Sequence, residues 1–170
     1  PTGTPPSGRW EPVAIYDPVR DRMVMFGGED GVYSNDVWEL SLNGTPHWTE
    51  LFPAGQAPAG RLAGAAVFDP MRQRFVGFGG TQGLPVDTWS RNLQGNANWQ
   101  HVPTNGARPN GSYAMTSVYD ASKDRMLIFG GSTSDDYYGA TNDTWELKLR
   151  GNPTWRLINT TGVRPAPRRS

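Results

Sequence analysis

The chain has 170 residues and a formal net charge of zero, because 16 Lys and Arg residues balance 16 Asp and Glu residues. This balance argues against a nonspecific nucleic-acid binder and against a polybasic membrane-surface role, since both need a surplus of positive charge. The sequence lacks cysteine, which excludes disulfides, thiol catalysis and thiolate metal sites and leaves the cellular compartment open. No apolar run approaches the roughly 20 residues of a transmembrane helix, and residues 1–6 are unlike a signal peptide.

Four landmarks recur three times in the same order, at a spacing of about fifty residues. They are an aromatic-Asp pair (Tyr16-Asp17, Phe68-Asp69, Tyr119-Asp120), a Gly-Gly pair (Gly27-Gly28, Gly79-Gly80, Gly130-Gly131), a first Trp (Trp38, Trp89, Trp145) and a second Trp (Trp48, Trp99, Trp155). Retention of this order in all three copies indicates an internal structural repeat.

Each copy predicts four short strands. In the first copy they are expected at 13–16, 23–26, 36–40 and around Trp48. The second copy places them at 65–68, 75–78, 87–90 and around Trp99, and the third at 116–119, 126–129, 143–147 and around Trp155. Asp-containing turns join the first two strands, and the second strand is an apolar run of the length of a buried strand. No segment shows a 3.6-residue apolar stripe, so the protein is expected to be all-β.

These landmarks resemble the kelch repeat, in which an Arg-containing segment precedes an apolar strand ending in Gly-Gly, an Asn-Asp-aromatic strand and a final Trp. The first copy matches with Arg9, Phe26-Gly27-Gly28, Asn35-Asp36-Val37-Trp38 and Trp48. The third matches with Phe129-Gly130-Gly131, Asn142-Asp143-Thr144-Trp145 and Trp155, and the second lacks the Asn before Asp87. The chain is similar to the bacterial kelch-like and galactose-oxidase central-domain group over residues 8–158.

The resemblance implies that each copy is one four-stranded blade of a β-propeller, with the first strand nearest the central axis. The expected fold is therefore a single all-β domain over residues 1–170, made of three kelch-type blades at 8–59, 60–110 and 111–163. Kelch rings close with six or seven blades, so three blades form a half-propeller.

A linear stack of three blades leaves one apolar face bare at each end. Two explanations fit this expectation. Two chains associate as a homodimer that completes a six-bladed ring, or the remaining blades belong to a longer chain of which this one is a fragment.

Variable loops on a constant scaffold are where binding residues concentrate. In a propeller, one face, here named the loop face, carries the connections from the second to the third strand and from the fourth strand to the next blade. The connections between the second and third strands differ in length among the copies, whereas the turns on the opposite face, the turn face, are short and constant. A protein or glycan ligand is therefore expected on the loop face. The candidate ligand-binding residues are Arg9, Trp10, Glu11, Arg61, Tyr113, Asp135, Asp136, Tyr137 and Tyr138.

The repeat also supplies structural explanations for some of these residues. Arg9 and Arg61 fit ion pairs with carboxylates of neighbouring blades, and Tyr137-Tyr138 fit a cap over the blade. Six of the seven Trp residues occupy repeat positions and are expected in the core, which leaves Trp10 as the aromatic outside the pattern.

Catalysis and metal binding have less support than binding. His47 and His101 are the two histidines, and neither belongs to a recognisable zinc or hydrolase motif. The cofactor of galactose oxidase needs a cysteine, so no cofactor and no metal are expected. The alternative function is a fragment of a propeller enzyme or a weak hydrolase with chemistry in the central channel, where Glu11 would act with Asp30 or Asp135. The small side chains of the first strands, such as Ala14, Ala66 and Ser117, favour binding instead.

Overall fold

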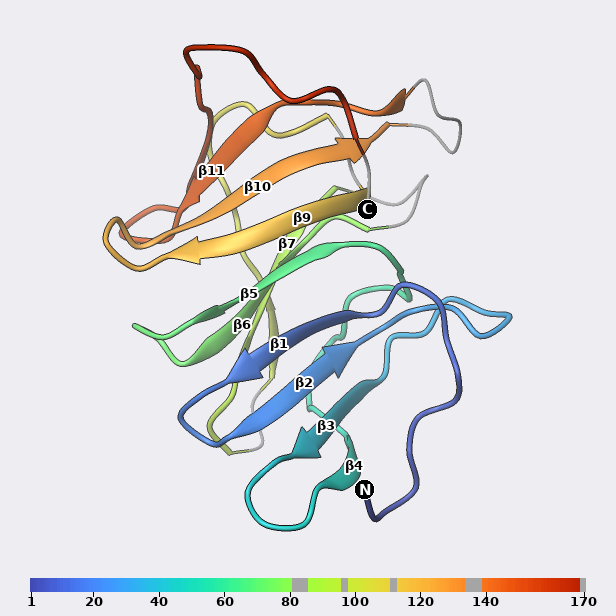
Figure 1. Cartoon of the computed structure of the whole chain (residues 1–170). Coiled ribbons are helices and arrows are strands. Elements are labelled where there is room, and N and C mark those ends of the chain that lie inside the picture. The colour runs from blue at the N-terminus through green and yellow to red at the C-terminus, as the bar shows by residue number, and fades with distance from the viewer. Residues whose placement is uncertain (81–85, 96–97, 111–112, 134–138, 169–170) are drawn as a thin grey trace.

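The computed structural model describes residues 1–80, 86–95, 98–110, 113–133 and 139–168 (Figure 1). These residues form three four-stranded antiparallel sheets in sequence order. Blade 1 contains β1 (Val13–Asp17), β2 (Arg22–Phe26), β3 (Val37–Ser41) and β4 (His47–Leu51). Blade 2 contains β5 (Ala65–Asp69), β6 (Arg74–Phe78), β7 (Thr88–Asn92) and β8 (Trp99–His101), and blade 3 contains β9 (Tyr113–Asp120), β10 (Arg125–Ser132), β11 (Thr144–Lys148) and β12 (Thr154–Leu157).

The expected all-β fold of three four-stranded blades is confirmed. The first strands β1, β5 and β9 lie side by side and link the sheets, while the later strands of each sheet run outward (Figure 1). Dimerisation and the blade limits at 8–59, 60–110 and 111–163 stay predictions.

Blade 3 differs from the other two in the length of its inner strands. β9 and β10 each have eight residues, whereas β1, β2, β5 and β6 have five. The extra pairing joins Gly130 to Met115 and Ser132 to Tyr113. Blade 1 has Pro12 in place of Met115 and blade 2 has Gly64, so the first lacks the N–H and the second lacks the side chain that favours continued pairing. The sequence predicted equal strands because its landmarks do not extend to this position.

Apolar side chains between adjacent sheets form the core. Between blades 1 and 2, Phe26 of the first blade packs on Trp99 of the second with ring centroids 4.8 Å apart, and Phe75 meets Trp99 edge-on at 5.5 Å. Between blades 2 and 3, Phe78 packs on Trp155 at 4.5 Å. Blades 2 and 3 therefore each present the Trp of their fourth strand to the preceding blade, which explains why this Trp recurs.

The Gly-Gly pair allows the next blade to begin close to the end of the second strand. The N–H of Gly28 donates to the carbonyl oxygen of Arg61 at 2.8 Å, and a Cβ on Gly27 would lie only 2.4 Å from the same oxygen. Gly27 and Gly28 also adopt φ values of 71° and 98°, which L side chains rarely take. Because Arg61 opens blade 2, this contact connects blade 1 to blade 2 through backbone atoms.

Candidate functional site

Arg9 and Arg61 hold the opening segments of blades 1 and 2 in place. Nη1 of Arg9 donates to Asp36 at 2.6 Å and to the carbonyl oxygen of Gly27 at 3.1 Å. Nη1 of Arg61 makes the equivalent bonds to Asp87 at 2.6 Å and to the carbonyl oxygen of Gly79 at 3.0 Å. Both guanidinium groups are largely buried. The aspartates belong to the same blade as each arginine, not to the neighbouring blade that the sequence suggested.

Trp10 is the most exposed aromatic side chain described on the loop face, with 78% of its surface accessible. Its backbone is nevertheless fixed, because the N–H of Trp10 donates to the oxygen of Glu29 at 2.8 Å and the N–H of Glu29 donates back at 3.0 Å. Gly8, Trp10, Glu29, Asp30 and Gly31 line a hollow of about 460 Å³, named here the Trp10 hollow. The ring is thus an exposed apolar surface on a rigid support beside two acidic residues.

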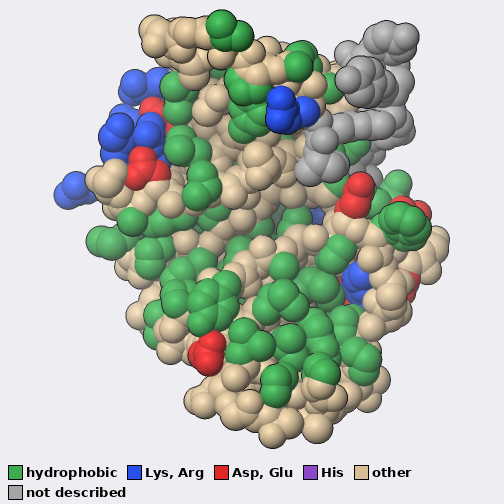
Figure 2. Space-filling model, in the orientation of Figure 1, with side chains coloured by type: hydrophobic (Ala, Val, Ile, Leu, Met, Phe, Trp, Pro, Cys, Tyr) green, Lys and Arg blue, Asp and Glu red, His purple; other side chains and the backbone are tan. Residues whose placement is uncertain are grey.

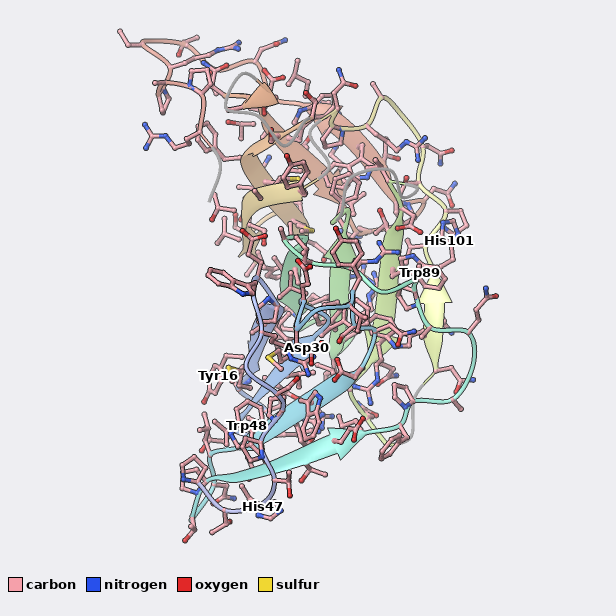
Figure 3. All side chains as sticks on the ribbon, turned by 90° about the vertical axis from the view of Figure 1, so that its right-hand side faces the viewer. Tyr16, Asp30, His47, Trp48, Trp89 and His101 are labelled. Atoms are coloured by element: carbon pink, nitrogen blue, oxygen red, sulfur yellow. The ribbon has the colours of Figure 1, made fainter. Side chains whose placement is uncertain are left out.

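Hydrogen bonds around Asp30 hold one wall of the Trp10 hollow. Ser7 donates its hydroxyl to the carboxylate of Asp30, and Nη2 of Arg9 donates to the hydroxyl oxygen of Ser7 at 3.0 Å. Asp30 lies at the loop end of blade 1 in Figure 3. Val32 and Tyr33 follow in the same loop, and both are exposed. The hollow therefore combines the aromatic ring of Trp10 with the hydrogen-bond acceptors of Glu29 and Asp30.

Glu11 lies at the mouth of a second hollow, formed by the first strands around the central axis. This central groove of about 410 Å³ is lined by Glu11, Pro12, Val13, Ala14, Ala63, Gly64, Ala66, Met115, Thr116 and Ser117. Glu11, Ala63 and Ala114 occupy equivalent positions, and all have left-handed φ values of 47°, 54° and 54°. The N–H of Ala63 donates to the oxygen of Glu11 at 2.8 Å, and the N–H of Ala114 donates to the oxygen of Ala63 at 2.6 Å. This backbone chain links the blades around the axis.

Tyr113 lies in the interior and is not presented to solvent. It is 7% exposed and packs with Leu62, Ala63 and Ala114 at the junction of blades 2 and 3. Trp10, Leu62 and Tyr113 occupy the same position in the three copies, yet only Trp10 faces solvent fully. Asp135, Asp136, Tyr137 and Tyr138 lie outside the described residues. The structure therefore gathers Trp10, Glu29 and Asp30 at one hollow and keeps Arg9, Arg61 and Tyr113 in packing roles.

The turn face carries a polar network that the sequence analysis missed. The buried carboxylate of Asp17 accepts hydrogen bonds from Arg20 at 2.9 Å and from Arg22 at 3.2 Å. Burial alone would raise the pKa of Asp17, but the bonds from Arg20 and Arg22 outweigh it and lower this pKa. Asp69 and Asp120 occupy the same place in the other blades. The repeated Arg of the second strand, present as Arg22, Arg74 and Arg125, was the available signal.

Blade 3 repeats this pattern with Asp120, whose carboxylate is partly exposed rather than buried. The hydroxyl of Ser122 donates to Asp120 at 2.6 Å, and Nε of Arg125 donates to it at 2.8 Å. These bonds lower the pKa of Asp120 to about 2. Arg72 of blade 2 contacts both oxygens of Asp124, and this bidentate pair lowers the pKa of Asp124.

The described residues offer no metal site. Nowhere in the described ranges do three His, Asp or Glu side chains come together in a way that could hold an ion. His47 and His101 belong to the outer strands of different blades, and His101 instead stacks edge-on against Trp89 with ring centroids 5.4 Å apart (Figure 3). Within the described ranges, no helix is long and apolar enough to cross a membrane.

Comparison with known proteins agrees with this architecture. The sequence model of the Attractin/LZTR1 β-propeller matches residues 1–168, nearly the whole chain. The chain belongs to the Attractin/LZTR1 β-propeller family. The kelch-type resemblance is thereby confirmed.

Two relatives of the chain are much longer than the chain itself. The leucine-zipper-like transcriptional regulator 1 homolog of Drosophila melanogaster is 30% identical over 167 residues, which cover 93% of this chain and 16% of the relative. Human multiple epidermal growth factor-like domains protein 8 is 33% identical over 122 residues, covering 64% of this chain and 4% of the relative. The solved structure of YjhT superposes with a TM-score of 0.64 at 20% identity, covering 92% of this chain and 47% of that one, and supports the fold alone.

Proposed function

We propose that the chain is part of a non-enzymatic binding module that holds a protein partner on its loop face. The observation that carries the proposal is Trp10, an aromatic residue that is 78% exposed on a backbone fixed by two hydrogen bonds. Tryptophan at the centre of a rigid patch is the residue type that most often supplies binding energy in protein interfaces. Glu29 and Asp30 add acceptors beside the ring, which suit donors of a partner.

A glycan ligand is the competing occupant of the same hollow, because a sugar ring also stacks on tryptophan and bonds to carboxylates. The two occupants can be separated by probing peptide arrays and glycan arrays with the intact chain. Trp10→Ala should abolish most of the peptide signal, while Met71→Ala, which removes an exposed apolar side chain on the turn face, should leave it unchanged. Equal peptide binding by the wild type and Trp10→Ala would contradict the proposal, and signal restricted to glycans would replace the protein partner with a carbohydrate.

The alternative of a hydrolase in the central channel has weaker support. Among the described residues that line the central groove, Glu11 is the titratable side chain. Acid–base hydrolysis by paired carboxylates needs a second group, and Asp30 lines the Trp10 hollow instead.

We also propose that the three blades act as half of a six-bladed ring. The contacts between β1, β5 and β9 place three blades in sequence around an axis, and the outward faces of blades 1 and 3 remain for further blades.

A further inference from the structure

The outward face of blade 1 carries apolar residues whose equivalents in the other two blades pack against the preceding blade. In Figure 2, hydrophobic side chains gather over the part of the molecule that blade 1 occupies in Figure 1. Tyr16, Met23, Leu40 and Trp48 are directly paired across the sheet and share one face. Figure 3 labels Tyr16 and Trp48 on blade 1. The equivalent residues of blade 3, Tyr119, Met126, Leu147 and Trp155, pack against blade 2. Tyr16 is 52% exposed, whereas Met126 and Leu147 are fully buried.

The outward face of blade 3 is the complement of this surface. Val67, Val76 and Phe78 of blade 2 are buried against blade 3. Val118, Leu127 and Phe129 occupy the same positions in blade 3, where Val118 is 59% exposed and the other two are partly exposed. The outward faces of blades 1 and 3 therefore match each other as the facing surfaces of adjacent blades within the chain do.

On the turn face, a cation of blade 1 and a cation of blade 2 are also placed to contact an acceptor of the next blade. Arg20 of blade 1 donates to Gln73 of blade 2 at 2.9 Å, and Arg72 of blade 2 donates to Asp124 of blade 3 at 2.8 Å. Continued by one step, this series places Lys123 of blade 3 opposite the position of Asp21 in a further blade. Lys123 is exposed, and Asp21 accepts a bond from the hydroxyl of Tyr16 on one oxygen. Asp124 has the equivalent bond from Tyr119 and also binds Arg72, so Asp21 retains room for a cation.

The C-terminal segment lies on blade 3 as the opening segment of another blade would. The N–H of Gly131 donates to the oxygen of Arg168 at 3.1 Å, and the N–H of Arg168 donates to Thr141 at 3.1 Å. Arg61, which opens blade 2, accepts from Gly28 at 2.8 Å and donates to Ser34 at 3.0 Å in the same arrangement on blade 1. Residues 165–168 therefore fill the place that the opening segment of a docked blade would take.

We propose that a second copy of this chain docks its blade 1 on blade 3 of the first, and that residues 165–168 compete with residues 6–9 of the second copy for this place. The proposal rests on the ring completion proposed above. Two such junctions, related by a two-fold axis, close the ring with six blades. Each junction buries the two matched apolar faces and pairs Lys123 with Asp21 of the other copy. The segment exchange is close to neutral, because the hydrogen bonds lost by Arg168 are the ones that Arg9 of the second copy can form.

Native mass across a concentration series tests the docking, since the monomer has a mass of 18.7 kDa and the dimer twice that. Deletion of residues 164–170 retains all twelve strands and should tighten association roughly tenfold, because the competing segment is gone. Lys123→Glu should weaken association roughly tenfold over two junctions, and so should Asp21→Lys. The double variant Asp21→Lys/Lys123→Glu should restore it, because the reversed pair attracts again.

Gln100→Glu is the matched control, because it adds negative charge on an exposed position of the middle blade, away from both end faces. It should leave the association constant unchanged. Folding of every variant is checked by the midpoint of thermal unfolding, so that a misfolded chain is not counted as a monomer. Dimers that ignore both charge reversals would overturn the docking geometry while leaving ring completion intact. A monomer at every concentration, for both the full chain and the shortened one, would overturn ring completion by a second copy.

Discussion

Arg91 is a charged side chain buried between blades 1 and 2. It is 4% exposed, and its Nε and Nη1 atoms have no hydrogen-bond partner among the described residues. Burial lowers the pKa of Arg91, and the nearby positive charge of Arg22 adds to this effect, while Glu39 opposes it. Leu40 and Leu147 stand at the same position in blades 1 and 3, so the repeat itself indicates which side chain the site accepts.

Arg91→Leu should therefore raise the stability of the chain. Each buried donor without a partner costs about 1–3 kcal/mol, and burying a leucine side chain contributes about 1.5–3 kcal/mol. Loss of the attraction to Glu39 and of contacts made by the arginine stem offsets part of this gain. We expect a net increase of about 1–4 kcal/mol, within the range found when buried charges are replaced by apolar residues.

Urea unfolding followed by tryptophan fluorescence measures this difference. The midpoint should rise without a change in the slope, and thermal unfolding should shift upward by about 2–4 °C for each kcal/mol. Arg91→Lys is the control that keeps the charge and should not stabilise the chain. The reciprocal variant Leu147→Arg should destabilise it, because it places an unpaired cation in the core between blades 2 and 3. A lower midpoint for Arg91→Leu would refute the reasoning and show that the guanidinium is compensated in the folded chain.

Three further predictions concern the scaffold. Arg61→Ala should destabilise the chain by about 2–4 kcal/mol in urea unfolding, because it leaves Asp87 without its 2.6 Å partner, and an unchanged midpoint would contradict the anchoring role. The folded chain should lose stability as the pH falls from about 4 to about 2, because the folded pKa of Asp120 is about 2 and its ionised carboxylate stabilises the fold only while it stays deprotonated. Asp120→Asn should make this decline shallower in acid unfolding. Gly77→Ile should destabilise the chain, because even a Cβ at this position would lie 2.7 Å from the ring of Phe75. Adding Phe75→Met should recover part of the lost stability, whereas simple additivity of the two changes in a double-mutant cycle would exclude the steric coupling.

The sequence predicted the architecture because the repeat records each packing requirement three times. The second Trp recurs because it packs against the preceding blade, as Trp99 and Trp155 do. Gly-Gly recurs because a Cβ at Gly27 would overlap the opening of blade 2. The longer strands of blade 3 were missed because they depend on Met115, which stands where the other copies have proline and glycine.

The candidate site was less predictable, since composition does not show which way a side chain faces. Arg9 and Arg61 were suitable ligand-binding residues by type, yet both bind aspartates at the ends of their own blades. Tyr113 was named with Trp10 among the candidates on the loop face, but it packs inside the junction of blades 2 and 3. Repetition of the arginine was the signal of a structural role, because a residue required by every blade belongs to the fold.

Positions that depart from the repeat are therefore more informative about function than repeated ones. Buried departures affect stability, whereas exposed departures are candidates for binding. Arg91 departs from leucine inside a core, where two of its buried nitrogen atoms lack hydrogen-bond partners and so lower stability. Trp10 departs at an exposed position, where its ring contributes little to packing and its backbone is held by Glu29. Covering a large apolar ring that the fold leaves exposed is favourable, so a partner that buries this ring is bound more tightly. Of the two departures, Trp10 is consequently the one that points to binding.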